Sequence, residues 1–355
     1  MEITVLIMAG GQGERFWPKS RANLPKQFLN ILDKNKTMIQ LTVERAEKIT
    51  NIKNIYIITN EKYKYLVKQQ INKLPEENII CEPASRNTAP CIGLAAMYIS
   101  KKYDDSIMVV LPADHAIKDD KEFLSTLDIA KNKAIEDENL VTIGIKPNYP
   151  ETGYGYIKYK KNENKNIFSV DKFVEKPNIA KAKQYLISGD YLWNSGMFIW
   201  KTSTIIKNIQ KYLPETYDKL IKIRDSIGTE KEQEILIKEF VSINKESIDY
   251  GIMEKAENIY TVPGYFGWDD VGSWSCLDRI NEKDDENNVK LGNVLTLETK
   301  NCIVYGEKRL IATLGISDLI IIDTEDALLV SSRKDVGNVK EIINKIKETN
   351  KEEYI

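Results

Sequence analysis

Apolar and polar positions along the first 150 residues predict strands that alternate with helices. Short apolar runs typical of buried strands occupy residues 3–8, 54–59, 106–111 and 140–145. Between them, apolar positions recur with the period of a helix over residues 37–49, 63–74, 88–103 and 123–135. Strands that alternate with helices indicate an α/β fold, with a parallel sheet covered by helices on both faces.

The pattern changes after Gly153. Strands of a mixed sheet are expected at residues 154–159 and 170–174, and a further strand is expected around Trp200. A short helix is expected at 180–186, a charged helical region at 215–246, and a strand followed by a loop at 260–274.

A polar stretch, residues 281–288, is typical of a linker or a domain edge. Short apolar segments follow at close spacing, at residues 294–297, 302–305, 311–314, 319–322 and 327–330. They predict a small all-β unit, and residues 336–346 predict an amphipathic helix at the end. We therefore expect two domains, residues 1–284 and 285–355.

Composition narrows the functional classes. Lys and Arg number 51 against 53 Asp and Glu, so no basic excess points to nucleic acid. No apolar run approaches the roughly 20 residues that span a bilayer. The four cysteines form no CxxC pair and the N-terminus lacks a signal peptide, which together predict a cytoplasmic protein. With His115 as the sole histidine, and that one expected to be structural, any metal should be hard and oxygen-bound.

Three glycines directly follow the first strand, at Gly10, Gly11 and Gly13. Such a turn lets backbone N–H groups approach an anion, and the nearby cations Arg15 and Lys26 suit phosphate oxygens. The Walker A pattern is absent, and Phe16 stands where the dinucleotide fingerprint needs a third glycine. The alternative is a glycine-rich surface turn, but the two cations favour a polyphosphate site.

Two carboxylates suit a magnesium ion beside that phosphate. Asp114 follows a buried strand, and Asp270 lies in a loop rich in Gly and Trp. Ligands of parallel sheets bind beyond the carboxyl ends of the strands, so we expect Asp114 near the glycine loop. Mg²⁺ takes one or two carboxylates together with phosphate oxygens and water. The alternatives are a helix N-cap or turn for Asp114 and a turn residue for Asp270.

Other polar residues suit a base and a sugar phosphate. Glu82 follows a short strand, and its carboxylate could accept from the two donors on the Watson–Crick edge of guanine. Glu175 and Lys176 adjoin one another at a strand end, where they could bind hydroxyls and a phosphate, and Asn194 could add hydroxyl contacts. The alternatives are a solvated loop glutamate and an exposed charged turn.

Taken together, these motifs resemble the mannose-1-phosphate guanylyltransferases of the bacterial type, within the sugar nucleotidyltransferases. The matching pieces occur in family order: residues 10–18 (GGQGERFWP), 25–28 (PKQF), 86–90 (RNTAP), 111–115 (LPADH), 153–157 (GYGYI), 173–177 (FVEKP), 193–198 (WNSGMF), 247–250 (SIDY) and 270–274 (DVGSW). Single pieces are shared with other sugar nucleotidyltransferases. The RNTAP piece and the final Trp-rich loop are more specific to this family.

The resemblance implies a Rossmann-like nucleotidyltransferase domain with a mixed central sheet, and a left-handed β-helix-like C-terminal unit. It implies transfer between GTP and mannose 1-phosphate, giving GDP-mannose and pyrophosphate, with Mg²⁺ on Asp114 and Asp270. Arg15 and Lys26 join these two as the expected catalytic residues. The nucleotide is expected on Ala9, Gly10, Gly11, Gly13, Glu82, Arg86, Asn87, Thr88 and Ala113.

The sugar phosphate is expected on Gly155, Glu175, Lys176 and Asn194. The all-β unit suggests a homodimer, and neither nucleic acid nor membrane is expected as a partner. One histidine cannot supply the ligands of the cupin-type isomerase domain that many relatives carry. Two alternatives stay open: a sugar nucleotidyltransferase of other specificity, and a non-catalytic nucleotide-sugar sensor. The retention of both cations and both carboxylates disfavours the sensor.

Overall fold

The computed structural model of the chain describes residues 1–11, 13–161, 166–349 and 351–355. It divides into two compact units. The large unit comprises Met1–Gly10, Thr42–Ala113 and Ile117–Trp268, and the small unit comprises Gly11–Leu41, Asp114–Ala116 and Asp269–Ile355. The predicted domain division after residue 284 stays a prediction.

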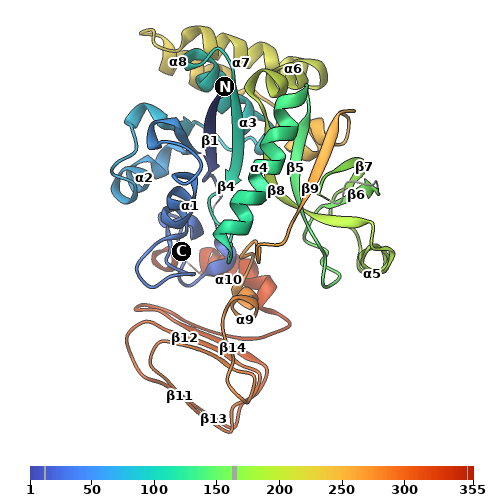
Figure 1. Ribbon diagram of the computed structural model, residues 1–355. Helices are drawn as coiled ribbons and strands as arrows, with labels where there is room; N and C mark the ends of the chain where they lie inside the picture. Colours follow the sequence, from blue (N-terminus) through green and yellow to red (C-terminus); the bar gives the residue numbers. More distant parts are fainter. Residues whose placement is uncertain (12, 162–165, 350) are drawn as a thin grey trace. The chain divides into compact units, whose positions relative to one another are not determined.

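The large unit is built on a mixed β-sheet, which has nine strands among the described residues, in the order β3-β2-β1-β4-β8-β5-β9-β7-β6 (Figure 1). Their bounds are β1 (Glu2–Met8), β2 (Ile55–Asn60), β3 (Ile79–Glu82), β4 (Ser106–Pro112), β5 (Leu140–Ile145), β6 (Tyr156–Lys160), β7 (Phe168–Val174), β8 (Tyr191–Lys201) and β9 (Ile259–Gly264). β1, β2, β3 and β4 are parallel, whereas β8 is antiparallel to both β4 and β5.

Helices cover both faces of this sheet. Side chains alternate between the two faces of the sheet along β1, and Leu6 lies on the face that four helices cover. These helices are α3 (Thr88–Lys102), α6 (Thr202–Tyr212), α7 (Pro214–Ser226) and α8 (Glu232–Val241). α4 (Asp120–Glu136) packs along β5, β8 and β9 (Figure 1). Its buried Phe123 meets Phe266 edge to face at 5.2 Å between ring centroids. The remaining helices are α2 (Lys64–Gln70) and α5 (Ile179–Ser188), and α1 (Met38–Ala46) spans the boundary at residue 41.

The small unit contains the predicted all-β segment. Short strands stack in parallel as successive coils: β10 (Val289–Leu291) on β12 (Ile303–Gly306) and then β14 (Leu319–Asp323), and β11 (Val294–Leu297) on β13 (Ile311–Leu314). β15 (Leu328–Ser332) closes the stack in the antiparallel direction, and α9 (Leu277–Ile280) and α10 (Val339–Glu348) flank it. Because Phe16, Trp274, Ile303 and Ile343 share one apolar core, the segment after the glycine loop is packed with the coils.

The predicted fold class is confirmed, and the differences from prediction have local causes. α6 was not predicted, because Thr202, Thr204 and Ile205 favour strand by propensity, yet they are buried in a helix. The charged region at 215–246 is two helices separated at Gly228, whose φ of 82° lies in the left-handed region. Across the described residues, we find no helix with the length and apolarity needed to cross a membrane.

Candidate functional site

Gly13 shapes the glycine loop by allowing close packing. Its φ is 64°, and a Cβ there would lie 2.5 Å from the backbone N of Lys26. A Cβ on Gly11, by contrast, would meet nothing within 4 Å. The loop therefore needs glycine at position 13 for its own fold, whereas Gly11 leaves open space beside the chain. Gln12, between these two glycines, lies outside the described residues.

Lys26 is a buried cation at the centre of the small unit's polar residues. Its Nζ lies 2.6 Å from Asp114 Oδ2 and donates to the main-chain oxygens of Asp270, at 3.1 Å, and Val271, at 2.8 Å. An ammonium has three donors, so these three oxygens account for all of them. Lys26 thus joins both predicted metal ligands, which lie more than 150 residues apart in the sequence.

A short backbone bridge brings the two predicted metal-binding segments together. Ala116 and Asp269 exchange N–H···O bonds of 2.8 and 3.1 Å as an isolated antiparallel pair. The buried Asp269 carboxylate also accepts from Val271 N at 2.8 Å and from the Arg279 guanidinium. Asp269 was not predicted; it orders the loop while its neighbour Asp270 carries the predicted metal role.

The turn after Asp270 is strained. Val271 is fully buried with φ of 50°, a conformation that β-branched residues rarely adopt and that costs about 1–3 kcal/mol. Gly272 donates to Asp270 Oδ1 at 3.1 Å, and a Cβ at Gly272 would lie 2.7 Å from Asp270 Oδ2. Glycine at 272 therefore allows the Asp270 carboxylate to fold back over its own turn.

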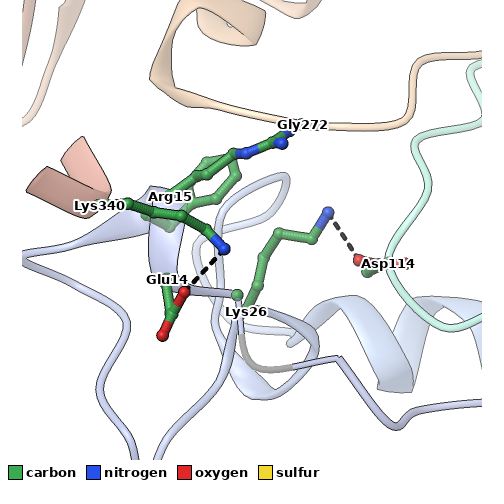
Figure 2. Close-up of a pocket in the computed structure, with 8 residues that line it drawn as sticks. Glu14, Arg15, Lys26, Asp114, Gly272 and Lys340 are labelled. Atoms are coloured by element: carbon green, nitrogen blue, oxygen red, sulfur yellow. Dashed lines mark ion pairs between the residues drawn. The ribbon is translucent and has the colours of Figure 1, made fainter. Parts of the chain in front are cut away.

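A cavity of about 240 Å³ lies beside Lys26, Asp114 and Gly272. Its lining consists of Gly13, Glu14, Arg15, Phe16, Lys26, Asp114, Gly272 and Lys340. Figure 2 shows Lys26 pointing to Asp114, Arg15 extending toward the loop of Gly272, and Lys340 pointing to Glu14. Pockets for drug-sized ligands measure roughly 300–1,000 Å³, so this smaller cavity suits a fragment such as the phosphate tail of a nucleotide.

The cavity's electrostatics favour an ionised Asp114. Burial, the largest single influence, would raise the pKa of its carboxyl, but the Lys26 ammonium together with His115 and a backbone hydrogen bond holds the pKa below its ordinary value. Burial lowers the pKa of His115, which keeps this side chain neutral at pH 7. Asp114 is thus a carboxylate ready to bind a cation.

The residues present fit a magnesium ion. Asp114 and Asp270 carry hard oxygen donors, and a cation, the Lys26 ammonium, already lies against the Asp114 carboxylate and the main-chain oxygen of Asp270. Within the described ranges, no cluster of three or more His, Cys, Asp or Glu side chains could hold a metal. A pair of carboxylates suits Mg²⁺, which completes its shell with water and substrate phosphate.

In the large unit, Glu82 lies at the end of β3 beside the start of the glycine loop. Its side chain is buried, and a Cβ on Gly10 would lie 3.3 Å from Glu82 Oε2. Burial raises the pKa of Glu82 to about 7, despite a hydrogen bond with Cys91 that lowers it. The alternative interpretation, a solvated loop glutamate, is therefore excluded. Ala9 and Ala113 flank the ends of β1 and β4, where Ala113 N donates to Met8 O at 3.0 Å.

The Arg86–Thr88 motif is engaged in local structure. The Arg86 guanidinium donates to Val241 O, and Asn87, with φ of 70°, accepts from Thr88 N at 2.8 Å where α3 begins. The Thr88 hydroxyl accepts from Ile248 N at 2.8 Å. These contacts attach the start of α3 to residues 241–248, beside Asp249.

The predicted sugar-phosphate residues lie together in the large unit. Asn194 N donates to Gly155 O at 2.8 Å, and a Cβ on Gly155 would lie 2.7 Å from Glu175 Oε2. Lys176 Nζ is 3.3 Å from Glu175 Oε1, with Lys176 largely exposed and Glu175 mostly buried. Glycine at 155 therefore lets the Glu175 carboxylate lie against the main chain beside Asn194.

Asp249 completes this cluster and was not predicted as a site residue, although the matching SIDY piece contains it. Asn194 Nδ2 donates to Asp249 Oδ1 at 2.7 Å, and Asn194 Oδ1 accepts from Gly196 N at 3.1 Å. Burial, with a contribution from the Glu175 charge, raises the pKa of Asp249 to about 6. The Asn194 amide is thus held in one orientation by partners on both atoms.

The class of protein follows from these features and from sequence comparison. Residues 4–287 match the family described as nucleotidyl transferase. Residues 292–346 match the MannoseP isomerase/GMP-like beta-helix domain, so the predicted β-helix-like unit is confirmed. This chain belongs to the nucleotidyl transferase family.

Individual relatives narrow the resemblance. The chain is 42% identical to mannose-1-phosphate guanylyltransferase of Salmonella montevideo, over 99% of this chain and 76% of that protein. It is 39% identical to mannose-1-phosphate guanylyltransferase of Escherichia coli K12, over 98% and 74%. The crystal structure of mannose-1-phosphate geranyltransferase from Thermus thermophilus matches with a TM-score of 0.90 and 32% identity, over 98% of this chain and all of that one. The predicted resemblance is confirmed.

Proposed function

We propose that this chain transfers a guanylyl group from GTP to α-D-mannose 1-phosphate. A phosphate oxygen of the sugar phosphate bonds to the α-phosphorus of GTP, and the bond from that phosphorus to the bridging oxygen breaks. GDP-mannose and pyrophosphate result. The observation that carries the proposal is Lys26, whose ammonium joins the glycine-loop segment to Asp114 and the Asp270 turn in one cavity of phosphate size.

The chemistry needs positioning and charge neutralisation more than proton transfer. The attacking phosphate is already ionised at pH 7, so no general base is required, which agrees with a chain that has one histidine. Arg15 faces the cavity and would offset charge on the departing pyrophosphate. Gly11 and Gly13 would let the backbone approach the triphosphate.

Enzymes of this family generally use a divalent metal ion. We assign Mg²⁺ to Asp114 and Asp270, whose hard oxygens fit it. When bound, the ion would neutralise phosphate charge during the transfer. The protein's own part is to hold these two residues in place, through the Lys26 contacts and the Ala116–Asp269 bridge.

Substrate recognition is assigned to the large unit. Glu82 would accept from the guanine ring N–H and amino group, as in carboxylate readout of base amino groups. Ala9, Gly10, Arg86, Asn87, Thr88 and Ala113 complete the proposed nucleotide site. Gly155, Glu175, Lys176 and Asn194 would hold the sugar phosphate, since carboxylate and amide oxygens bind hydroxyls and a lysine binds phosphate.

The test is a grid of nucleotides and sugar phosphates incubated with the purified protein. GDP-mannose should form from GTP and mannose 1-phosphate far faster than products form from ATP, UTP, dTTP or glucose 1-phosphate. Preference for another pair would make the chain a nucleotidyltransferase of other specificity. Binding of GDP-mannose without turnover would make it a sensor.

We further propose a homodimer and a cytoplasmic location. Leu295 and Leu297 on β11 and Leu314 on β13 are 61%, 62% and 66% exposed, and Leu297 pairs with Leu314 across the strands. An exposed apolar stripe of this kind suits contact with another chain. All four cysteines are free thiols, which suits a reducing compartment. Light scattering of the purified protein and of Leu297→Lys would test the dimer.

A further inference from the structure

One cation in the phosphate-sized cavity comes from the C-terminal end of the small unit. Lys340 belongs to the first turn of α10, far in sequence from the glycine loop, and it lines the cavity with Arg15 and Lys26. Its Nζ lies 2.9 Å from Glu14 Oε2 (Figure 2). Sequence patterns gave no sign of it, because Lys340 occupies the polar face of an amphipathic helix.

The helix is held firmly at this residue. Val339 and Ile343, on either side of Lys340 in the sequence, are buried in the core that also contains Phe16. The first turn of α10 is therefore fixed against the segment that carries Glu14 and Arg15. This packing fixes the position of the Lys340 backbone, and the ion pair with Glu14 fixes the position of the Lys340 ammonium group.

The two lysines of the cavity differ in what they can still bind. Lys26 has all three of its donors on protein oxygens, those of Asp114, Asp270 and Val271. Lys340 makes one ion pair, with Glu14, among the described residues, and its side chain is 58% exposed. An exposed pair of this type is weak, so a polyphosphate can replace the single carboxylate.

We propose that Lys340 is a phosphate-binding residue for the pyrophosphate part of GTP and for the pyrophosphate product. The inference rests on the proposed function and adds a residue from the β-helix end of the chain to it. Glu14 holds the ammonium beside the cavity when no nucleotide is bound and gives it up to phosphate oxygens. Lys26 then acts mainly as a positioning residue for Asp114 and the Asp270 turn.

The test compares Lys340→Met and Lys340→Arg with a matched control. Lys345→Met alters a lysine of the same helix that is 74% exposed and paired with Glu348. In the reverse reaction, Lys340→Met should raise the KM for pyrophosphate roughly tenfold, as expected for loss of one charge-assisted hydrogen bond, while the KM for GDP-mannose changes less than about twofold. Lys340→Arg should restore most of the loss, and Lys345→Met should match wild type.

A second measurement separates this inference from the proposed function. Calorimetric titration with magnesium pyrophosphate reports binding without turnover, and thermal unfolding reports whether each variant is folded. Weaker pyrophosphate binding by folded Lys340→Met supports the role of Lys340 even if mannose 1-phosphate proves not to be the substrate. Unchanged pyrophosphate binding and KM in that variant, or an equal rise in the KM for GDP-mannose, overturns it.

Discussion

The Lys26 ammonium lies 2.6 Å from the Asp114 carboxylate, and it also donates to the carbonyl of the strained residue Val271. Lys26, which is predicted to bind phosphate, thus forms an ion pair with Asp114, which is predicted to bind the metal ion. Removing it would leave a carboxylate and two main-chain oxygens without their cation. Lys26→Met should therefore lower both activity and stability, the latter by about 1–3 kcal/mol, as when oxygens away from bulk water lose their donor.

Lys26→Arg distinguishes charge from shape. A guanidinium carries its donors in a planar fork and cannot direct three of them from one atom. We expect this variant to lose most activity although the charge is kept. Near-wild-type kcat and melting temperature in Lys26→Arg would contradict the positioning role.

The metal assignment predicts that Asp114→Asn and Asp270→Asn each remove most turnover while the protein stays folded. A neutral amide is a poor Mg²⁺ ligand, and the lost stabilisation of several kcal/mol is at least about a hundredfold in kcat. Asp335→Asn, which changes an exposed carboxylate of the same unit, is the control. The test is the activity of each variant measured over a range of Mg²⁺ concentrations. A near-normal kcat in either variant at the Mg²⁺ concentration that saturates the wild type would refute the assignment of the metal ion to these residues.

Two glycines of the loop should respond differently to substitution. A Cβ at Gly11 meets open space, so Gly11→Val should fold but lose GTP affinity by obstructing the phosphate approach. A Cβ at Gly13 would collide with Lys26 N at positive φ, so Gly13→Ala should lower the free energy of unfolding by more than about 1 kcal/mol. Thermal unfolding and GTP titration separate the two effects. Wild-type GTP affinity in Gly11→Val would contradict the phosphate loop.

This pair of glycines shows what the sequence could and could not predict. The strand, the glycine cluster and the cations were readable because each is local. The need for glycine at position 13 could not be predicted, because it arises from a close contact with Lys26, thirteen residues later in the chain. Asp269 looked like Asp270 in the sequence, and only the pairing with Ala116 separates an ordering carboxylate from a candidate ligand.

Tertiary contacts also give several polar residues partners or burial that the sequence did not predict. Glu82 appeared to be a loop residue, but β3 buries it. Arg86 is predicted to bind the nucleotide, and in the structure its guanidinium also donates to the main-chain oxygen of Val241. Asp249 acquires its place through Asn194, which lies 55 residues earlier in the chain. Such pairings follow from the sheet and helix packing, which periodicity alone does not define.

The raised pKa of Glu82 predicts a pH-dependent affinity for GTP. Guanine offers two donors, so it needs the ionised carboxylate, whereas the unbound carboxyl, with a pKa of about 7, is mostly protonated below pH 7. Binding must then release a proton, and the KM for GTP should rise up to tenfold per pH unit as pH falls below about 7. The KM for GTP measured between pH 5.5 and pH 8.5 gives the profile.

Glu82→Gln is the matching variant. It replaces one acceptor oxygen with a donor, so it should weaken GTP, narrow the preference over ATP and abolish the pH dependence above. The mismatch typically costs about 1–3 kcal/mol, roughly ten- to hundredfold. An unchanged ratio of kcat/KM for GTP and ATP would place base recognition elsewhere.

Asp249 should act on the sugar phosphate through Asn194. Asp249→Leu removes the acceptor of the Asn194 amide N–H, so that only the hydrogen bonds to the amide oxygen still orient this side chain. The KM for mannose 1-phosphate should rise roughly fivefold to tenfold, corresponding to about 1–1.4 kcal/mol, while the KM for GTP stays the same. Asp249→Asn, which keeps an acceptor oxygen, should lose less. Equal rises in both KM values would indicate a general folding defect instead.

The most direct test of guanylyl transfer follows two labels of GTP in one reaction with mannose 1-phosphate and Mg²⁺. Label from the α-phosphate should appear in GDP-mannose, and label from the γ-phosphate should appear in pyrophosphate, in equal amounts. Release of γ-label as inorganic phosphate, or absence of α-label from any sugar product, would contradict the account.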